Sequence, residues 1–280
     1  MKNTNTISSY GKINIHIGVI KKQNPNFHKI ETLVTYVDLC DKIYIKEINN
    51  KKNKIIFYGN YAKRIGAKNT ISKLLYLLER ENITKNKRYL IKIKKNIPPK
   101  SGMGGGSMNA ASILRFIIKK NKIKLEKKKI VSLCKIIGSD VQLGLDNQTK
   151  IMFKNGEIKN VTRFKSYLLI VLPNFGCSTK HIYKNLIKYS KTCLKSNKKY
   201  NLNNSKNLYN DLESSAFELY PKLANLKKNL QILPNIDFAR MTGSGSVIIG
   251  YFRKKIDALH GAKLIKKKYK NYWCIVSKTI

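Results

Sequence analysis

Long apolar runs are scarce in this sequence of 280 residues. No run approaches the roughly 18 apolar residues that a membrane helix requires. The apolar segment 12–19 is interrupted by Asn14 and His16, so it is not the core of a secretion signal either. The sequence therefore predicts a cytoplasmic protein with no membrane partner.

Cysteine is also sparse and irregularly placed. The five cysteines, at positions 40, 134, 177, 193 and 274, are odd in number and include no C-x-x-C pair. A disulfide framework or a zinc ribbon needs cysteines at paired, regular spacings. The sequence therefore predicts reduced thiols and no zinc site, and it assigns the cysteines no role.

Acidic residues are few: 15 Asp and Glu stand against 57 Lys and Arg, which gives a net charge of +42. Clustered positive charge favours nucleic-acid phosphates as a partner. However, only seven basic residues are arginine, the residue that suits base recognition and bidentate phosphate contacts. Lysine, asparagine and isoleucine all have A/T-rich codons, so gene composition explains the bias more simply. Nucleic-acid binding as the main function stays a less favoured alternative.

The remaining composition is that of a folded protein, with 42% hydrophobic and 9% aromatic residues in one large or two moderate domains. Apolar spacing predicts an α+β chain in two lobes, 1–162 and 163–280. The predicted strands are 12–19, 31–37, 42–48, 89–95, 167–172 and 247–252. Helices are predicted near 70–79, 110–118 and 125–137, a glycine turn at 241–245, and an Asn-, Ser- and Lys-rich surface connection at 195–206.

Glycine is concentrated in one stretch, "IPPKSGMGGGSMNAASILRFII" at 97–118, which has four glycines in five positions. A predicted strand precedes it and a helix with one apolar face follows it. Helix N-termini carry unpaired N–H groups and a partial positive charge, and glycines let an anion approach them closely. Taken only as a glycine-rich turn, the stretch fits a structural role as well. The neighbouring prolines and the helix favour a phosphate site. It contains neither G-x-x-x-x-G-K-[ST] nor G-x-G-x-x-G, so two better-known phosphate loops are excluded.

The stretch 98–111 matches the pattern P-x-x-x-G-[LM]-G-G-G-S-x-N-A-A and resembles the ATP loop of the GHMP kinases. Six further motifs follow the family order: "GKINIHI" at 11–17, "FH" at 27–28, "GSDV" at 138–141, "FGCSTKHIY" at 175–183, "NDLE" at 210–213 and "MTGSGS" at 241–246. The motifs "FH" and "NDLE" resemble those members that phosphorylate the 2-hydroxyl of a cytidine-diphosphate-linked methylerythritol, in the non-mevalonate route to isoprenoids. A family member acting on another small alcohol remains an alternative.

This resemblance implies a two-lobed α+β fold, with an N-terminal lobe like ribosomal protein S5 domain 2 and a ferredoxin-like C-terminal lobe. It also implies ATP and Mg²⁺ as cofactors, with the cytidine compound as the small-molecule partner. Oligomeric state is not implied. Asp140 matches the family's proton acceptor, and Lys12 would keep it ionised. Taken alone, Asp140 is typical of a cap or turn residue, and Lys12 is one lysine among fifty.

The resemblance assigns two groups of binding residues. For ATP they are Asn69, Lys95, Pro98, Pro99, Lys100, Ser101, Gly102, Met103, Gly104, Gly105, Gly106, Ser107, Met108 and Asn109. For the second substrate they are Asn14, Phe27, His28 and Tyr183, with the two aromatic rings stacked on cytosine and His28 at its edge. Without the motifs, Phe27 would be a core aromatic residue and His28 a surface histidine.

The chain departs from the family pattern at several positions. Lys100 and Ser101 replace the usual Ala-Ala or Gly-Gly, and Met108 replaces a serine. Gln142 to Gly144 replace the usual Pro-Phe-Phe, and Pro25 and Asn26 replace Asp-Gly. Loss of the hydroxyl at Met108 predicts weaker Mg²⁺ binding and a slower enzyme.

Overall fold

The structure of this chain is a computed structural model that describes residues 4–24 and 27–280, with the side chains of Asn24, Phe27 and Arg64 outside the description. The chain forms two compact units. Unit 1 comprises Met1–Gly11, Leu39–Pro99 and Gly104–Asp146, and unit 2 comprises Lys12–Asp38, Lys100–Met103 and Asn147–Ile280. The long strands β1 (Asn5–Asn24) and β2 (Phe27–Ile48) contribute residues to both units.

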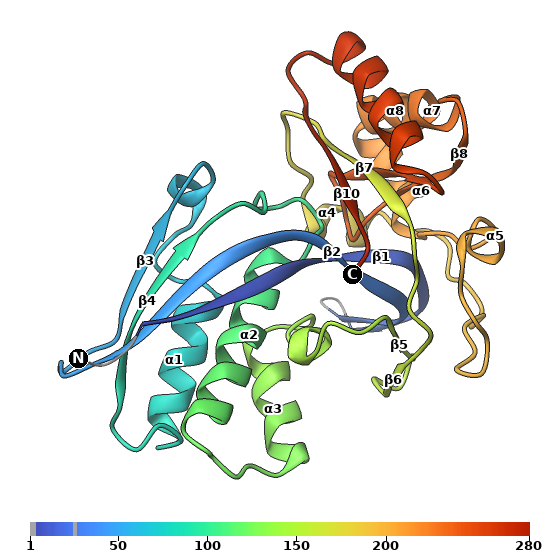
Figure 1. Cartoon of the computed structure of the whole chain (residues 1–280). Coiled ribbons are helices and arrows are strands. Elements are labelled where there is room, and N and C mark those ends of the chain that lie inside the picture. The colour runs from blue at the N-terminus through green and yellow to red at the C-terminus, as the bar shows by residue number, and fades with distance from the viewer. Residues whose placement is uncertain (1–3, 25–26) are drawn as a thin grey trace. The chain divides into compact units, whose positions relative to one another are not determined.

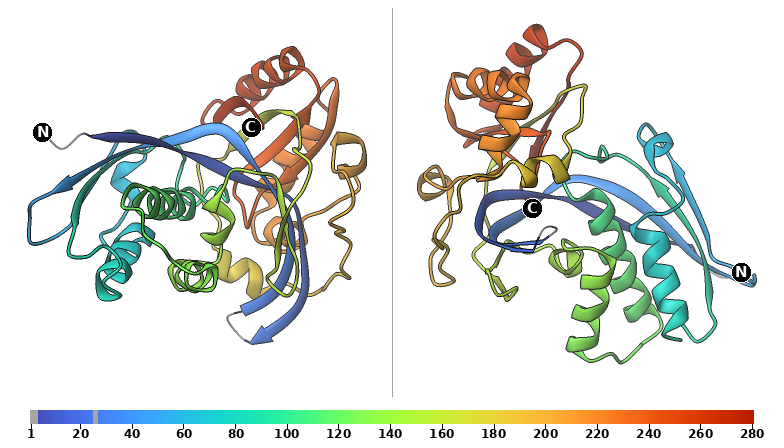
Figure 2. Two further views of the ribbon diagram at one scale, coloured as in Figure 1. Left: turned by 60° about the horizontal axis from the view of Figure 1, so that its bottom comes forward. Right: turned by 180° about the vertical axis from the view of Figure 1, so that it is seen from behind.

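Unit 1 contains strands that are covered on one face by helices. The second half of β2 pairs antiparallel with β4 (Arg88–Lys94), and β3 (Lys54–Tyr58) pairs parallel with β4. Helices α1 (Thr70–Arg80), α2 (Gly105–Lys120) and α3 (Lys127–Ile137) lie on the same face of these strands (Figure 1, and from behind in Figure 2). Two short 3₁₀ helices, η1 (Ala62–Arg64) and η2 (Gln142–Leu145), complete the unit.

The core of unit 1 follows from the period of two in its strands. Ile43, Ile45, Ile91 and Ile93 are almost fully buried and share one face. Helix α1 presents buried side chains at helical spacing, among them Leu74 and Leu78, to the same cluster. The opposite face of these strands carries mostly lysine and tyrosine side chains, together with Ile48, Ile56 and Leu90.

Unit 2 contains an antiparallel sheet of four strands in the order β10-β7-β9-β8. These strands are β7 (Tyr167–Leu172), β8 (Ile236–Met241), β9 (Ile248–Phe252) and β10 (Trp273–Lys278). Helices α7 (Pro221–Gln231) and α8 (Lys255–Lys268) pack on this sheet (Figure 1). The remaining elements are β5 (Lys150–Met152), β6 (Ile158–Asn160), α4 (Thr179–Lys184), α5 (Leu202–Ser205) and α6 (Leu212–Leu219).

Most elements predicted from the spacing of apolar residues are confirmed. The structure has strands at 88–94, 167–172 and 248–252 and helices at 70–80, 105–120 and 127–137. The prediction of separate strands at 31–37 and 42–48 was wrong, because β2 continues through both. The connection at 195–206 contains α5, a helix that was not predicted. The predicted lobe boundary between 162 and 163 falls within unit 2 and stays a prediction.

No helix in the described part of the chain has the length and apolar character needed to cross a bilayer.

Candidate active site

The glycine stretch ends at the N-terminus of α2, as predicted. Gly104 is the N-cap residue and has a φ of 65°, a left-handed conformation that glycine adopts without strain. Gly105, Gly106 and Ser107 form the first turn, whose N–H groups have no acceptor within the helix. The backbone N–H of Met108 already donates to the carbonyl of Gly104 at 2.9 Å. The N–H groups without an acceptor in the helix therefore belong to three successive residues.

Residues 100–103 of the stretch belong to unit 2 and contact the predicted glycine turn at 241–245 in the same unit. Gly102 has a φ of 77°, and a Cβ atom there would lie 2.1 Å from the carbonyl oxygen of Thr242. The Thr242 hydroxyl donates to the carbonyl of Gly102 at 3.4 Å, and Val247 donates its N–H to the carbonyl of Ser101 at the same distance. The close approach of the backbone at Thr242 therefore explains why position 102 is a glycine.

Two of the predicted ATP residues have no N–H to offer. Pro98 and Pro99 lack an amide hydrogen, so they can offer no backbone N–H to a phosphate, and their assignment to ATP stays a prediction. Lys100 is exposed, has a φ of 55° and belongs to unit 2 with Met103. The Met103 carbonyl accepts a hydrogen bond from the N–H of Lys12 at 3.0 Å.

A buried carboxylate, Asp41, joins β2 to both sides of the glycine stretch. One oxygen accepts the backbone N–H groups of Asn96 and Ile97 at 2.8 and 2.9 Å. The other oxygen forms an ion pair with Lys95 and accepts from Nδ2 of Asn109 at 2.9 Å. Asp41 is fully buried and Lys95 is 3% exposed.

This cluster brings together two predicted ATP residues, Lys95 and Asn109, through a residue that the sequence analysis missed. A signal was present, because Asp41 has the same strand parity as the buried Ile43 and Ile45 and therefore points toward the core. The Lys95 ammonium lies 3.4 Å from where a Cβ of Gly105 would be, so the cluster supports the start of α2.

Asn69 lies at the N-cap of α1 and uses its side chain there. Its Oδ1 accepts the N–H groups of Ile71 and Ser72 at 2.9 and 3.1 Å, and its Nδ2 donates to the carbonyl of Gly66 at 2.9 Å. The neighbouring Thr70 hydroxyl donates to the carbonyl of Gly106 at 2.9 Å. The capping box therefore places the beginning of α1 beside the beginning of α2.

Lys12 and Asn14 are neighbours on β1, as the strand period predicts. The Lys12 ammonium donates to Oδ1 of Asn14 at 2.9 Å, and Nδ2 of Asn14 donates to the Thr32 hydroxyl at 2.8 Å. The backbone N–H of Gly243 also donates to Oδ1 of Asn14, at 3.1 Å. Both side chains are at most 4% exposed, so Asn14 fixes the direction of the Lys12 side chain.

Asp140 is half-buried and lies in a turn between α3 and η2. Its carbonyl accepts the N–H of Leu143 at 3.2 Å. A Cβ atom at Gly138 would lie 3.8 Å from the Ser107 hydroxyl, so this turn is close to the first turn of α2. Lys12 belongs to unit 2 and Asp140 to unit 1, and their pairing stays a prediction.

The residues predicted for cytosine lie partly together. His28 on β2 and Tyr183 on α4 have ring centroids 4.9 Å apart, tilted by 38°. The ring of Tyr189, which was not predicted, stacks toward His28 at 6.5 Å. Phe27 was predicted as the second stacking ring, and its side chain lies outside the described part of the structure.

His28 is suited to bind a polar group. Its Nε2 is buried and has no hydrogen-bond partner among the described residues. Burial lowers the pKa of His28 below 6.5, and the positive charge of Lys22 lowers it further. The imidazole is therefore neutral near pH 7 and offers one donor and one acceptor nitrogen.

A second cluster, which the sequence analysis did not predict, contains the buried His16 and Glu31 and the exposed Cys193. The Nε2 of His16 lies 3.6 Å from Oε1 of Glu31 and 3.5 Å from the Cys193 sulfur. The N–H of Tyr209 points at Nδ1 of His16, so Nδ1 is the acceptor and Nε2 carries the proton that faces Glu31. A metal-bound histidine has the opposite arrangement, with its second nitrogen donating. The cluster is therefore a hydrogen-bonded anchor for the segment around Cys193, whose N–H donates to Glu31 at 2.6 Å.

Comparisons with solved structures and with a family model show the class of fold. A crystal structure of a 4-(cytidine 5'-diphospho)-2C-methyl-D-erythritol kinase has a TM-score of 0.77 at 20% identity, covering 99% of this chain and 100% of the other. The homoserine kinase of Cytophaga hutchinsonii has a TM-score of 0.72 at 16% identity, covering 100% and 95%. Residues 65–155 match the N-terminal domain of the GHMP kinases. The fold is thus the α+β fold of the GHMP kinases, as predicted.

A similarity in sequence then gives the particular family. The 4-diphosphocytidyl-2-C-methyl-D-erythritol kinase of Pelagibacter ubique (strain HTCC1062) is 44% identical over 281 residues, which cover 99% of this chain and 100% of that relative. The chain belongs to the 4-diphosphocytidyl-2-C-methyl-D-erythritol kinase family. The family predicted from the seven motifs is confirmed.

Proposed function

We propose that this protein transfers the γ-phosphoryl group of ATP to the 2-hydroxyl of 4-diphosphocytidyl-2-C-methyl-D-erythritol. The observation that carries the proposal is the 44% identity along the whole chain to the Pelagibacter ubique kinase named for this substrate. The fold alone is shared with kinases of other small alcohols. The residues around His28 support the cytidine compound as the acceptor.

The N-terminus of α2 is the proposed site for the ATP phosphates. The N–H groups of Gly105, Gly106 and Ser107 and the positive end of a helix of 16 residues favour an anion there. Lys95 and Asn69 remain predicted ATP contacts, although both side chains already have protein partners. Their present contacts hold the two helix starts that surround the phosphates.

Asp140 is the proposed acceptor of the proton that leaves the 2-hydroxyl. Phosphoryl transfer depends mainly on position and charge, and a carboxylate that takes the hydroxyl proton is the usual additional group. The Lys12 ammonium would favour the ionised form of that carboxylate and balance charge on the transferred group. Asn14 is a positioning residue, because it holds the Lys12 side chain by a hydrogen bond of 2.9 Å.

The cytosine ring is proposed to lie against Tyr183, with Phe27 on its second face. The unpartnered Nε2 of His28 would then form a hydrogen bond with the polar edge of the base. Stacking on aromatic rings contributes about 1–3 kcal/mol per base. Binding of this end would hold the reacting hydroxyl in place.

Mg²⁺ fits the oxygen donors that this chain offers in the first turn of α2 and in the turn that contains Asp140. Met108 is 2% exposed and packs in the core, so it offers no ligand. The Ser107 hydroxyl and the Asp140 carboxylate are hard oxygen donors, and ATP phosphates would supply the rest. Bound there, the ion would neutralise phosphate charge.

A cytoplasmic location is proposed because the sequence has neither an apolar run of membrane-helix length nor the core of a secretion signal.

A coupled assay of ADP release tests the proposal. The purified chain is supplied with ATP, Mg²⁺ and one of three acceptors: 4-diphosphocytidyl-2-C-methyl-D-erythritol, homoserine or mevalonate. We expect ADP release with the first acceptor at a kcat/KM at least a hundredfold above the other two. Equal rates with homoserine or mevalonate would overturn the choice of substrate, and no release with any acceptor would overturn the kinase assignment.

A further inference from the structure

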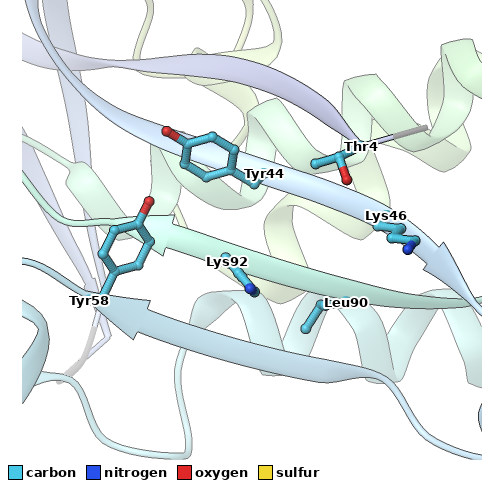
Figure 3. Close-up of a pocket in the computed structure, with 6 residues that line it drawn as sticks. All are labelled: Thr4, Tyr44, Lys46, Tyr58, Leu90 and Lys92. Carbon is cyan, nitrogen blue, oxygen red and sulfur yellow. The ribbon is translucent and has the colours of Figure 1, made fainter. Parts of the chain in front are cut away.

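The strands of unit 1 have one face that none of the described helices of that unit covers. Side chains on this face line a hollow of about 430 Å³ (Figure 3). The lining residues come from all three paired strands and from the segment before β1: Thr4, Tyr44, Lys46, Tyr58, Leu90 and Lys92. Figure 3 shows the two tyrosine rings at one end of the hollow and Lys46 at the other. None of these residues is used by the proposed phosphoryl transfer.

The charge of this face is of one sign. Lys42 of β2 lies opposite Lys94 of β4, and Leu90 of β4 lies between Lys46 and Lys54. The outward positions of the described strand segments 42–48, 54–58 and 88–94 include no Asp or Glu. Like charges directly opposite each other on neighbouring strands are destabilising. A bound polyanion would relieve this repulsion.

Aromatic rings are interleaved with these lysines. The ring centroids of Tyr44 and Tyr58 are 6.4 Å apart, and Tyr58 is 39% exposed. Tyr44 lies opposite Lys92, and Tyr58 lies beside Lys94 in the register. Exposed rings next to flexible point charges are the two components of sequence-tolerant binding to single strands, in which bases stack and phosphates pair with lysine.

We propose that this face binds single-stranded nucleic acid as an activity separate from phosphoryl transfer. A second copy of the chain fits poorly, because two faces of like charge would meet on molecules of net charge +42. A membrane surface fits less well, because the hollow offers one leucine and no Phe or Trp for insertion. The pattern predicts little sequence preference, since lysine contacts phosphate as a point charge.

Fluorescence anisotropy with a labelled 12-nucleotide single-stranded RNA tests the proposal on the full chain. The double variant Lys46→Gln/Lys92→Gln is expected to bind at least tenfold more weakly. It should also reduce the slope of log K against log salt by about 1.4, since two phosphate contacts are lost. The matched control is Lys127→Gln/Lys128→Gln, which removes two exposed lysines from α3 and should change affinity less than twofold.

Stacking has its own matched pair of variants. Tyr58→Ala is expected to weaken RNA binding at least fivefold. Tyr58→Phe keeps the aromatic ring and should bind RNA with the affinity of the unmodified chain. Tyr76→Ala is the control, because Tyr76 is 61% exposed but lies on α1. Circular dichroism melts confirm that each variant is folded.

Three results would overturn the proposal. The first is an equal loss of affinity in the lysine variants of the face and of α3, which would mean binding by overall charge. The second is no effect of Tyr58→Ala together with equal affinity for duplex RNA. The third is binding to vesicles of 3:1 phosphatidylcholine and phosphatidylserine without binding to the RNA.

Discussion

Replacement of Asp41 by asparagine tests how far one buried carboxylate supports the glycine stretch. The side chain keeps its shape but loses its charge and one acceptor. If the amide oxygen stays toward Asn96 and Ile97, the new NH₂ group faces Lys95 and Asn109, which are both donors. If the amide turns over, the two backbone N–H groups lose their acceptor. Neither orientation satisfies all four donors.

The expected cost is large because the Lys95 ammonium would remain buried without a partner. Lys95 is 3% exposed and Asp41 is fully buried. Removal of one member of a buried ion pair costs about 3–5 kcal/mol in the free energy of unfolding. We therefore expect Asp41→Asn to lower the free energy of unfolding by about 3 kcal/mol or more.

Urea denaturation followed by circular dichroism measures this change at pH 7. The double variant Asp41→Asn/Lys95→Met removes the unpaired charge and should recover a large part of the loss. The two substitutions are therefore expected to be coupled by about 1–3 kcal/mol. A loss below about 1 kcal/mol in Asp41→Asn, or additive effects of the two substitutions, would refute the account of this cluster.

The remaining predictions concern catalysis, substrate binding, acid stability and backbone packing. Asp140→Asn should lower kcat by about 10²- to 10⁴-fold, the usual contribution of a general base, as measured by ADP release. Tyr183→Ala should raise KM for the cytidine substrate at least fivefold and leave KM for ATP unchanged, because stacking on one base face is lost. Burial alone would raise the pKa of Glu31, but hydrogen bonds from His16 and two backbone N–H groups outweigh it and leave the pKa below 4.5. The stabilisation from Glu31 is thus complete above pH 4.5 and is lost as the pH falls through the folded-state pKa, so Glu31→Gln should flatten the pH dependence of unfolding in urea below pH 4.5. Gly102→Ala should lower the melting temperature markedly, because its Cβ would lie 2.1 Å from the Thr242 carbonyl oxygen.

Each of these predictions has a contrary result. A loss of kcat below tenfold in Asp140→Asn would leave this residue with a positioning role only. Equal changes of both KM values in Tyr183→Ala would argue against a cytosine contact. Unchanged acid sensitivity in Glu31→Gln would show that other carboxylates control it. Gly176→Ala is the matched glycine control, since its Cβ would meet no atom closer than 3.8 Å.

The spacing of apolar residues predicted helices and strands well where their packing partners are near in sequence or where the whole segment is buried. The strand at 167–172 is apolar because both of its faces are covered, and its limits were predicted correctly. The continuity of β2 was not predictable in the same way, because Asp38 and Asp41 interrupt its apolar pattern. Asp38 accepts a hydrogen bond from the N–H of Lys278 at 3.2 Å, and Asp41 binds the chain around Asn96. Their partners are distant in sequence, so the apolar pattern alone does not indicate that the strand continues.

In the candidate site, too, residues that belong to a motif were predicted, and residues that act only through distant partners were missed. The motif matches indicated His28 and Tyr183, whose rings lie 4.9 Å apart, and their roles toward cytosine stay predictions. A helix was predicted after the glycines of 97–118, and it begins earlier than expected, at Gly105. The motif matches did not indicate that Gly102 lacks a side chain because Thr242 occupies that space. Nor did they indicate Asp41, because a single carboxylate in a strand carries no motif. Side chains that satisfy distant backbone groups are visible only once the fold brings those groups together.

The buried guanidinium of Arg240 has a consequence for how this sequence can change. It donates to the carbonyls of Ile15 and Ser205 at 2.7 and 3.1 Å, and also to those of Lys206 and Leu208. A lysine has three donors on one nitrogen and cannot reach four oxygens spread over two segments. In a lineage whose codons change from arginine toward lysine, we expect position 240 to keep its arginine. The few arginines that persist in such a proteome can therefore mark the places where geometry, and not charge, is under selection.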